Sequence, residues 1–135
     1  MPYSDFKQVA MCLDYKRLGK QRVECYQILR TLKGDSKGWI NHPIVKMWRG
    51  KEVVLGQYAT TMCEEWIKRG YKDTLKPKLE ELQLYFLERG HNEIPSWIYD
   101  EELLKSHQSN LLRKDEQHYK QFFSVANDLP YKWVY

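Results

Sequence analysis

The sequence lacks the short motifs that are typical of nucleotide-binding and zinc-dependent enzymes. It contains no phosphate-binding loop, no GxGxxG and no HExxH. Its cysteines, Cys12, Cys25 and Cys63, are odd in number and have neither CxxC nor His-flanked spacing. We therefore expect small buried thiols of a reducing compartment, without a disulfide framework or a zinc site. The sequence predicts no metal and no other cofactor.

Long apolar runs are also missing. No stretch reaches 18 apolar residues, and the start of the chain has no signal-peptide pattern. These absences predict a cytoplasmic protein without a membrane partner. The 135 residues are 42% hydrophobic and 14% aromatic, which excludes a disordered chain. A chain of this length can form its core as one domain, which we expect to span residues 1–135.

Positive charge is unevenly distributed along the chain. The formal net charge is +4, but residues 1–50 hold ten Lys and Arg against four Asp and Glu. Residues 51–135 hold twelve against fourteen. A basic N-terminal part indicates a polyanionic partner, and the alternative is an ordinary solvated helix face.

Hydrophobic residues recur at helical spacing along nearly the whole chain, and no stretch alternates convincingly like a strand. Ser4 and Asp14 are candidate caps of the first two helices. The sequence predicts an all-α fold, a compact single-domain helical bundle with an irregular aromatic C-terminal tail. The predicted helices cover residues 5–12, 15–33, 43–48, 51–69, 77–89, 100–114 and 115–123.

The long predicted helix carries polar side chains where apolar ones are expected. Gln21 and Arg22 fall inside its apolar arc, and Arg17, Gln21 and Glu24 follow one another along the border of that arc. A buried, unpaired charge is costly, so an inward Arg22 needs an acidic partner, a substrate or a water-filled cleft. The pattern leaves open an internal Arg–Glu strut between helices and a catalytic or phosphate-binding cleft.

Glu24 is the carboxylate of this basic helix. Among neighbours such as Arg17 and Lys20, it suits the stabilisation of a developing cation or work as a base. The alternative is a helix-surface pair between Lys20 and Glu24.

A second polar group lies in the predicted helix 100–114. His107 falls in the middle of the apolar stripe, and Asn110 and Lys114 flank it on the same face. Such a histidine can bind a phosphate, move a proton or fasten two helices together.

Aromatic side chains gather in the predicted loops and the tail. Mixed with Lys and Arg, aromatic rings suit stacking on bases, although most Trp side chains in a small helical protein belong to the core. The rings in question are those of Trp39, His42, Trp48, His91, Trp97, Tyr131, Trp133 and Tyr135.

The N-terminus is a further candidate. Pro2 is small enough to allow removal of Met1, which exposes a secondary amine. An amine of this kind can attack a sugar C1′ and form an iminium, as bifunctional DNA glycosylases do. The alternative is an N-terminus without a chemical role.

Several segments together resemble a known family. The spacing Leu13-Asp14-xxx-Leu18-xxxxx-Glu24 is similar to the first long helix of the pyrimidine-dimer DNA glycosylases of the phage endonuclease V type. Residues 42–71 resemble the middle helices of that family, and YKWVY resembles its aromatic ending. The segments LDYKRLGKQRVE, NHPIVKMW and SHQSNLLRKDEQHY are similar to a branch of small bacterial and phage proteins in the same superfamily.

The resemblance implies roles for four residues. Glu24 falls at the position of the catalytic glutamate, and Pro2 becomes the nucleophile once Met1 is removed. Arg17 and Arg22 fall on or beside helix positions whose basic side chains grip phosphates around a flipped nucleotide. The sequence departs from the family in its nucleophile type and in Val23, which stands where an arginine is typical.

We therefore expect a base-excision enzyme, an N-glycosylase with AP-lyase activity, that acts as a monomer on a damaged or modified base flipped from duplex DNA. Two alternatives stay open: a non-catalytic nucleic-acid-binding module, and an enzyme that acts on a modified base or nucleotide without imine chemistry. The expected catalytic residues are Pro2 and Glu24. The expected DNA-binding or substrate-binding residues are Arg17, Lys20, Gln21, Arg22, His107, Asn110 and Lys114.

Overall fold

The computed structural model describes residues 1–132, and these residues form helices, turns and irregular segments without a strand. The predicted all-α fold is confirmed. The elements are α1 (Phe6–Cys12), α2 (Tyr15–Lys33), α3 (Pro43–Trp48), α4 (Glu52–Lys68), α5 (Lys76–Glu88), the 3-10 helix η1 (Ser96–Tyr99), α6 (Glu101–Lys114) and α7 (Glu116–Tyr119).

Helix ends follow from local side chains, with two corrections to the sequence prediction. Asp5, and not Ser4, caps α1, since its carboxylate accepts a hydrogen bond of 3.1 Å from the backbone N–H of Gln8. The last helix, α7, ends at Tyr119 instead of continuing to Phe123. Gly34 ends α2 as predicted, with a φ of 97° that favours glycine.

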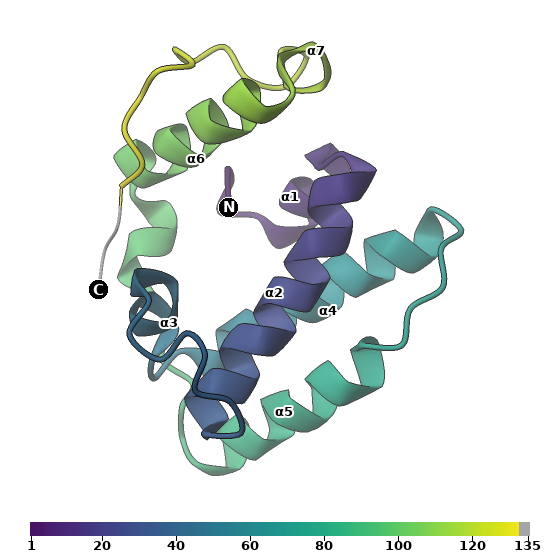
Figure 1. Cartoon of the computed structure of the whole chain (residues 1–135), viewed down its shortest axis with the longest axis vertical. Coiled ribbons are helices and arrows are strands. Elements are labelled where there is room, and N and C mark those ends of the chain that lie inside the picture. The colour runs from purple at the N-terminus through teal and green to yellow at the C-terminus, as the bar shows by residue number, and fades with distance from the viewer. Residues whose placement is uncertain (133–135) are drawn as a thin grey trace.

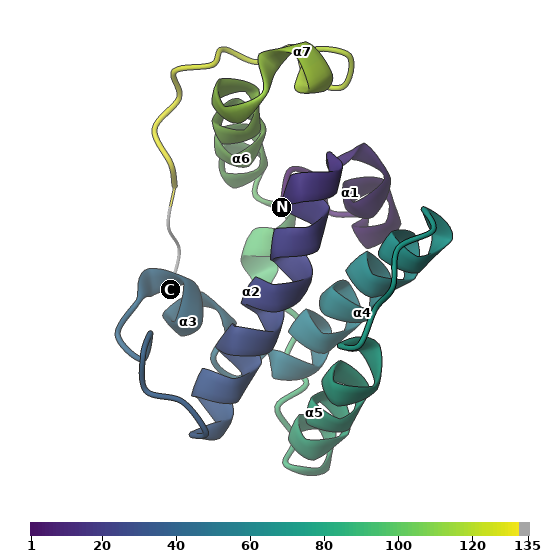
Figure 2. The same ribbon diagram turned by 45° about the vertical axis from the view of Figure 1, so that its right-hand side comes forward.

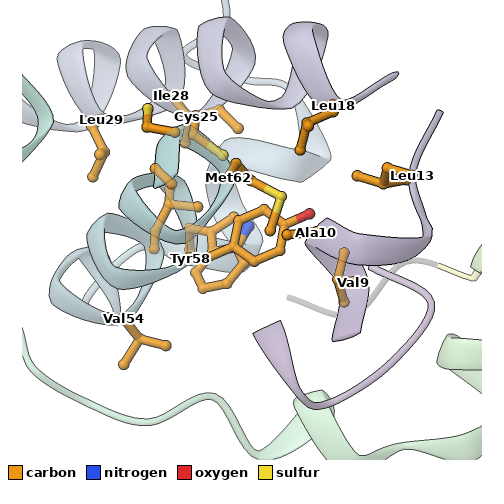
Figure 3. Close-up of a cluster of buried hydrophobic side chains, with 14 of the residues drawn as sticks. Val9, Ala10, Leu13, Leu18, Cys25, Ile28, Leu29, Val54, Tyr58 and Met62 are labelled. Carbon is orange, nitrogen blue, oxygen red and sulfur yellow. The ribbon is translucent and has the colours of Figure 1, made fainter. Parts of the chain in front are cut away.

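The core forms where α2 crosses α4, with α1 and α5 also packed on α4 (Figure 1). Figure 3 shows how side chains of α2, among them Leu18, Cys25 and Leu29, face Tyr58 and Met62 of α4. The backbones of α4 and α5 approach closely at Gly56, where an added Cβ would lie 2.9 Å from the Cβ of Gln83. This crossing fixes the direction of α2 and therefore the face that it turns towards α6.

Helices α6 and α7 stand apart from this crossing, and the N-terminus lies beside α6 on the side of α1 and α2 (Figures 1 and 2). Tyr119 of α7 donates a hydrogen bond to the carboxylate of Asp14, and the Nε2 atom of His118 lies 2.8 Å from the carbonyl oxygen of Cys12. These bonds hold α7 against the turn between α1 and α2.

The irregular segment after α7 runs back along α6. Arg113 donates hydrogen bonds to the carbonyl oxygens of Asn127 and Leu129, and Lys132 pairs with Asp100 at 2.7 Å. The irregular tail predicted from the sequence is therefore present up to residue 132. Trp133 and Tyr135, the last aromatic residues of that tail, lie outside the described residues.

The three cysteines are buried free thiols, as predicted. Burial raises the pKa of Cys12 and of Cys63 to about 12 and raises that of Cys25 further, so all three stay protonated at neutral pH. No helix within residues 1–132 is both long and apolar enough to span a membrane.

Candidate active site

The N-terminus, α2, α4, α6 and the tail together line a cavity of about 160 Å³, here called the basic lobe. Eight of the nine residues that the sequence singled out line it, although they come from opposite ends of the chain. The lining residues are Met1, Pro2, Leu13, Arg17, Lys20, Gln21, Glu24, Tyr58, His107, Asn110, Leu111, Lys114 and Tyr131.

The N-terminal amine lies against His107 inside this cavity. The amine nitrogen of Met1 is hydrogen-bonded to the Nδ1 atom of His107, and the carbonyl oxygen of Met1 lies 3.1 Å from the same atom. Gln108 fixes the next residue, since its side-chain amide donates a hydrogen bond of 2.9 Å to the carbonyl oxygen of Pro2. Hydrogen bonds to α6 therefore hold the first two residues of the chain in place.

Both members of this pair are neutral at pH 7. Burial lowers the pKa of the Met1 amine to about 5, so the nitrogen keeps its lone pair. Burial, together with the neighbouring amine, lowers the pKa of His107 to about 2. A neutral amine at the wall of a cavity is a potential nucleophile, and a neutral imidazole beside it can accept a proton.

Glu24 faces the same cavity and is oriented by a hydrogen-bonded chain from α4. The hydroxyl of Tyr58 donates to the side-chain oxygen of Gln21 at 2.6 Å, and the amide nitrogen of Gln21 donates to Glu24 at 3.2 Å. The sequence left open a surface ion pair between Glu24 and Lys20. That pair is not among the ion pairs of residues 1–132. Gln21 therefore positions the carboxylate.

Cations surround the opening of the basic lobe. Lys20 of α2 and Lys114 of α6 are exposed, and Arg17 is half-buried with its guanidinium 3.2 Å from the carboxylate of Asp14. Asn110 adds an amide to the same wall. Two helices thus present positive charge on the two sides of one cavity, an arrangement suited to a phosphate backbone that passes across it.

Arg22 lies elsewhere, since it is absent from the lining of the cavity and only 8% exposed. Its Nε and Nη2 atoms both donate to one carboxylate oxygen of Asp73, the first at 3.0 Å, and its guanidinium lies 4.5 Å from the ring centroid of Trp66. The other oxygen of Asp73 accepts a hydrogen bond from the backbone N–H of Lys76. Arg22 is therefore a strut between α2 and the start of α5, with an aspartate in place of the glutamate considered from the sequence.

A second cavity of about 110 Å³, here called the aromatic lobe, adjoins the first. Six residues line both lobes: Met1, Gln21, Glu24, Tyr58, His107 and Tyr131. Its other walls come from α2, α3, α4 and η1 and consist of Cys25, Ile28, Ile44, Met47, Trp48, Leu55 and Trp97.

Sequence reasoning missed part of this site. It did not single out Tyr58 as a site residue, and it grouped Trp48, Trp97 and Tyr131 only as aromatic rings of loops and tail. The rings of Trp48 and Trp97 meet edge to face with centroids 4.9 Å apart, and the ring of Tyr131 stacks on His107 at 4.7 Å. Their aromatic character was visible, but their meeting depends on the tertiary fold.

Residues 1–132 contain no cluster of three or more His, Cys, Asp or Glu side chains arranged to hold a metal ion. The comparisons with known proteins give one match. A family model described as pyrimidine dimer DNA glycosylase matches residues 1–79. No curated protein and no solved structure matches the chain. The matched part contains Glu24, Gln21 and Tyr58, whereas His107 and Trp97 lie beyond it.

Proposed function

Because the chain belongs to the pyrimidine dimer DNA glycosylase family, we propose that it is a base-excision enzyme, an N-glycosylase with AP-lyase activity on a damaged or modified base in DNA. One observation carries the proposal. The N-terminal end of the chain and Glu24 line the same cavity, and basic side chains of two helices surround its opening. An amine and a carboxylate at one site are the two groups that this chemistry requires.

In the proposed reaction the N-terminal nitrogen attacks C1′ of the flipped nucleotide. The new C1′–N bond replaces the glycosidic bond, and the base leaves with the bonding electron pair. Glu24 stabilises the cationic character that develops at the sugar ring. The nitrogen then loses its proton, and its lone pair forms the iminium as the C1′–O4′ bond breaks and O4′ takes up a proton. The iminium acidifies the neighbouring C2′–H, and removal of that proton eliminates the 3′ phosphate.

Removal of Met1 makes the nitrogen of Pro2 the terminal secondary amine. Pro2 is buried and lines the basic lobe, which supports a role for its nitrogen at this site. A secondary amine forms an iminium directly on a ring-opened sugar, which suits the lyase step. We therefore assign Pro2 as the nucleophile of the processed chain.

The proposed partner is duplex DNA bound by a monomer in the cytoplasm. Lys20, Lys114 and Arg17 neutralise phosphates on both sides of the cavity, and this releases counterions. The N-terminal nitrogen can attack C1′ only after the nucleotide has left the base stack. Damaged or mispaired nucleotides unstack easily and are therefore favoured as substrates.

The substitution Glu24→Gln tests the proposal. It keeps the shape of the side chain and removes its charge, so we expect strand cleavage of ultraviolet-irradiated and abasic duplexes to fall by about a hundredfold or more. DNA affinity should stay within a few-fold of the parent. Glu80→Gln, on the exposed face of α5, is the matched control and should cleave at the parental rate. Parental cleavage by the Glu24 variant contradicts the assigned role.

A further inference from the structure

Gln108 contacts the proposed nucleophile directly, across 106 positions of the chain. Its side-chain amide donates a hydrogen bond of 2.9 Å to the carbonyl oxygen of Pro2. The contacts of its neighbour His107 go instead to the amine and the carbonyl oxygen of Met1, so they are lost when Met1 is removed. The bond from Gln108 is made to Pro2 itself and therefore does not depend on Met1.

This bond lies close to the nucleophilic nitrogen. The pyrrolidine ring of Pro2 joins the nitrogen to the Cα atom, so only the bond between Cα and the carbonyl carbon can rotate between the ring and the bound carbonyl group. Pro2 is buried, which restricts that rotation. The hydrogen bond and the burial of the ring together fix the direction in which the nitrogen points.

The residue after Pro2 is anchored as well. The ring of Tyr3 packs on that of Phe123 with centroids 5.6 Å apart, and Tyr3 is partly buried against the core. The first residues of a chain are usually poorly ordered unless something ties them down. Here the peptide group between Pro2 and Tyr3 is held on both sides, and it lies at the cavity that Glu24 lines.

Gln108 acts from outside the cavity. It lines neither the basic lobe nor the aromatic lobe, whereas Pro2 lines the basic lobe. Its helix, α6, is supported in turn by the irregular segment after α7, because the backbone N–H of Leu129 donates to the hydroxyl oxygen of Ser109 at 3.0 Å. Gln108 therefore reaches the reacting atoms only through Pro2, from a helix that is itself held in place.

We propose that Gln108 is a positioning residue for the nucleophile: it holds Pro2 so that the terminal nitrogen of the processed chain faces C1′ of the nucleotide under attack. The inference rests on the proposed function and adds a residue that lies beyond the matched residues 1–79. A misplacement of about 1 Å at a reacting atom costs about a hundredfold in rate. A single hydrogen bond to Pro2 therefore governs the bond-forming step.

The substitution Gln108→Met tests the inference in the processed protein, with removal of Met1 verified by intact mass. Methionine keeps the length of the side chain and lacks the N–H donor. Borohydride reduces the iminium formed with an abasic duplex to a stable adduct. At saturating duplex, we expect the rate constant of adduct formation at the N-terminus to fall about ten- to hundredfold. The final yield of adduct, and the affinity for a tetrahydrofuran abasic analogue, should stay within about twofold of the parent.

Gln121→Met is the matched control. The side-chain amide of Gln121 also donates to a backbone carbonyl, that of His118 at 2.8 Å, but it does so in the exposed turn after α7. This control should form the adduct at the parental rate. Should Gln108→Met fold poorly, Gln108→Glu keeps the shape of the side chain and replaces the donor by a carboxylate oxygen, and it should slow adduct formation at least as much.

The rate constant and the final yield separate positioning from stability. A partly unfolded protein gives less adduct with an unchanged rate constant, whereas a misdirected nitrogen gives the parental amount more slowly. A parental rate constant in Gln108→Met, with or without a lower yield, overturns the inference and leaves the amine chemistry of the proposed function standing. A parent protein that forms no adduct at its N-terminus refutes the proposed function, and the inference falls with it.

Discussion

The strut between Arg22 and Asp73 gives a sharp prediction about stability, because removing Asp73 leaves a guanidinium buried without its anion. The Asp73 side chain is inaccessible to solvent and that of Arg22 is 10% exposed. Removing one partner of a buried ion pair costs about 3–5 kcal/mol. In Asp73→Asn the amide oxygen still accepts one hydrogen bond, which favours the lower end, about 3 kcal/mol. For a domain of this size that loss corresponds to about 10 °C in Tm.

Urea denaturation followed by tryptophan fluorescence measures the free energy of unfolding of both proteins. Asp35→Asn is the matched control, because Asp35 pairs with Lys33 at 3.6 Å on the surface, where an ion pair contributes less than about 1 kcal/mol. The stability difference should depend on pH. Burial acts to raise the pKa of Asp73, but the hydrogen bonds from Arg22 and from the backbone N–H groups of Lys76 and Leu75 outweigh it and lower that pKa.

The sign follows from this lowered pKa. The stabilisation by ionised Asp73 is fully present above the pKa of an unfolded aspartate, about 3.9, and is lost as the pH falls through the folded value. The difference between parent and variant should therefore be constant near neutral pH and shrink in acid. A loss below about 1 kcal/mol at pH 7 refutes the strut.

Two further predictions concern packing and DNA contact. Gly56→Ala forces apart the backbones of α4 and α5, since the new Cβ meets Gln83 at 2.9 Å, and should lower the free energy of unfolding by about 1–3 kcal/mol in the same urea assay; an unchanged midpoint contradicts the close approach. Lys114→Gln should weaken binding to duplex DNA of any sequence and reduce the slope of log affinity against log salt by about 1, measured by anisotropy between low and physiological salt. A parental slope removes Lys114 from the DNA interface.

The helices were largely predictable because their signals are local. Gly34 and Pro43 mark helix ends within a few residues, and the apolar spacing marks the buried faces. Asp14 stands at the N-cap position of α2, but its side chain makes no capping hydrogen bond. The cap of α1 was assigned to Ser4 because Ser4 and Asp5 are adjacent candidates of similar quality. The helix η1 was missed because a single turn of four residues after Pro95 has no periodic pattern to detect.

The residues of the site could be predicted from the sequence, but the cavity that brings them together could not. Polar side chains at inward positions of two predicted helices identified Glu24, Gln21 and His107 one by one. Their common cavity depends on how α6 returns across α2, a contact between segments far apart in the chain. Arg22 shows the same limit, because its partner Asp73 lies 51 positions away and nothing near Arg22 in the sequence points to it.

The central claim is that the N-terminal nitrogen is the nucleophile. The most direct test is borohydride reduction of the protein with an abasic duplex, followed by intact and peptide mass spectrometry, with an N-terminally blocked protein as control. We expect one adduct, mapped to the N-terminal residue and absent from the blocked protein. No adduct, or adducts on lysine side chains that persist after blocking, contradicts it.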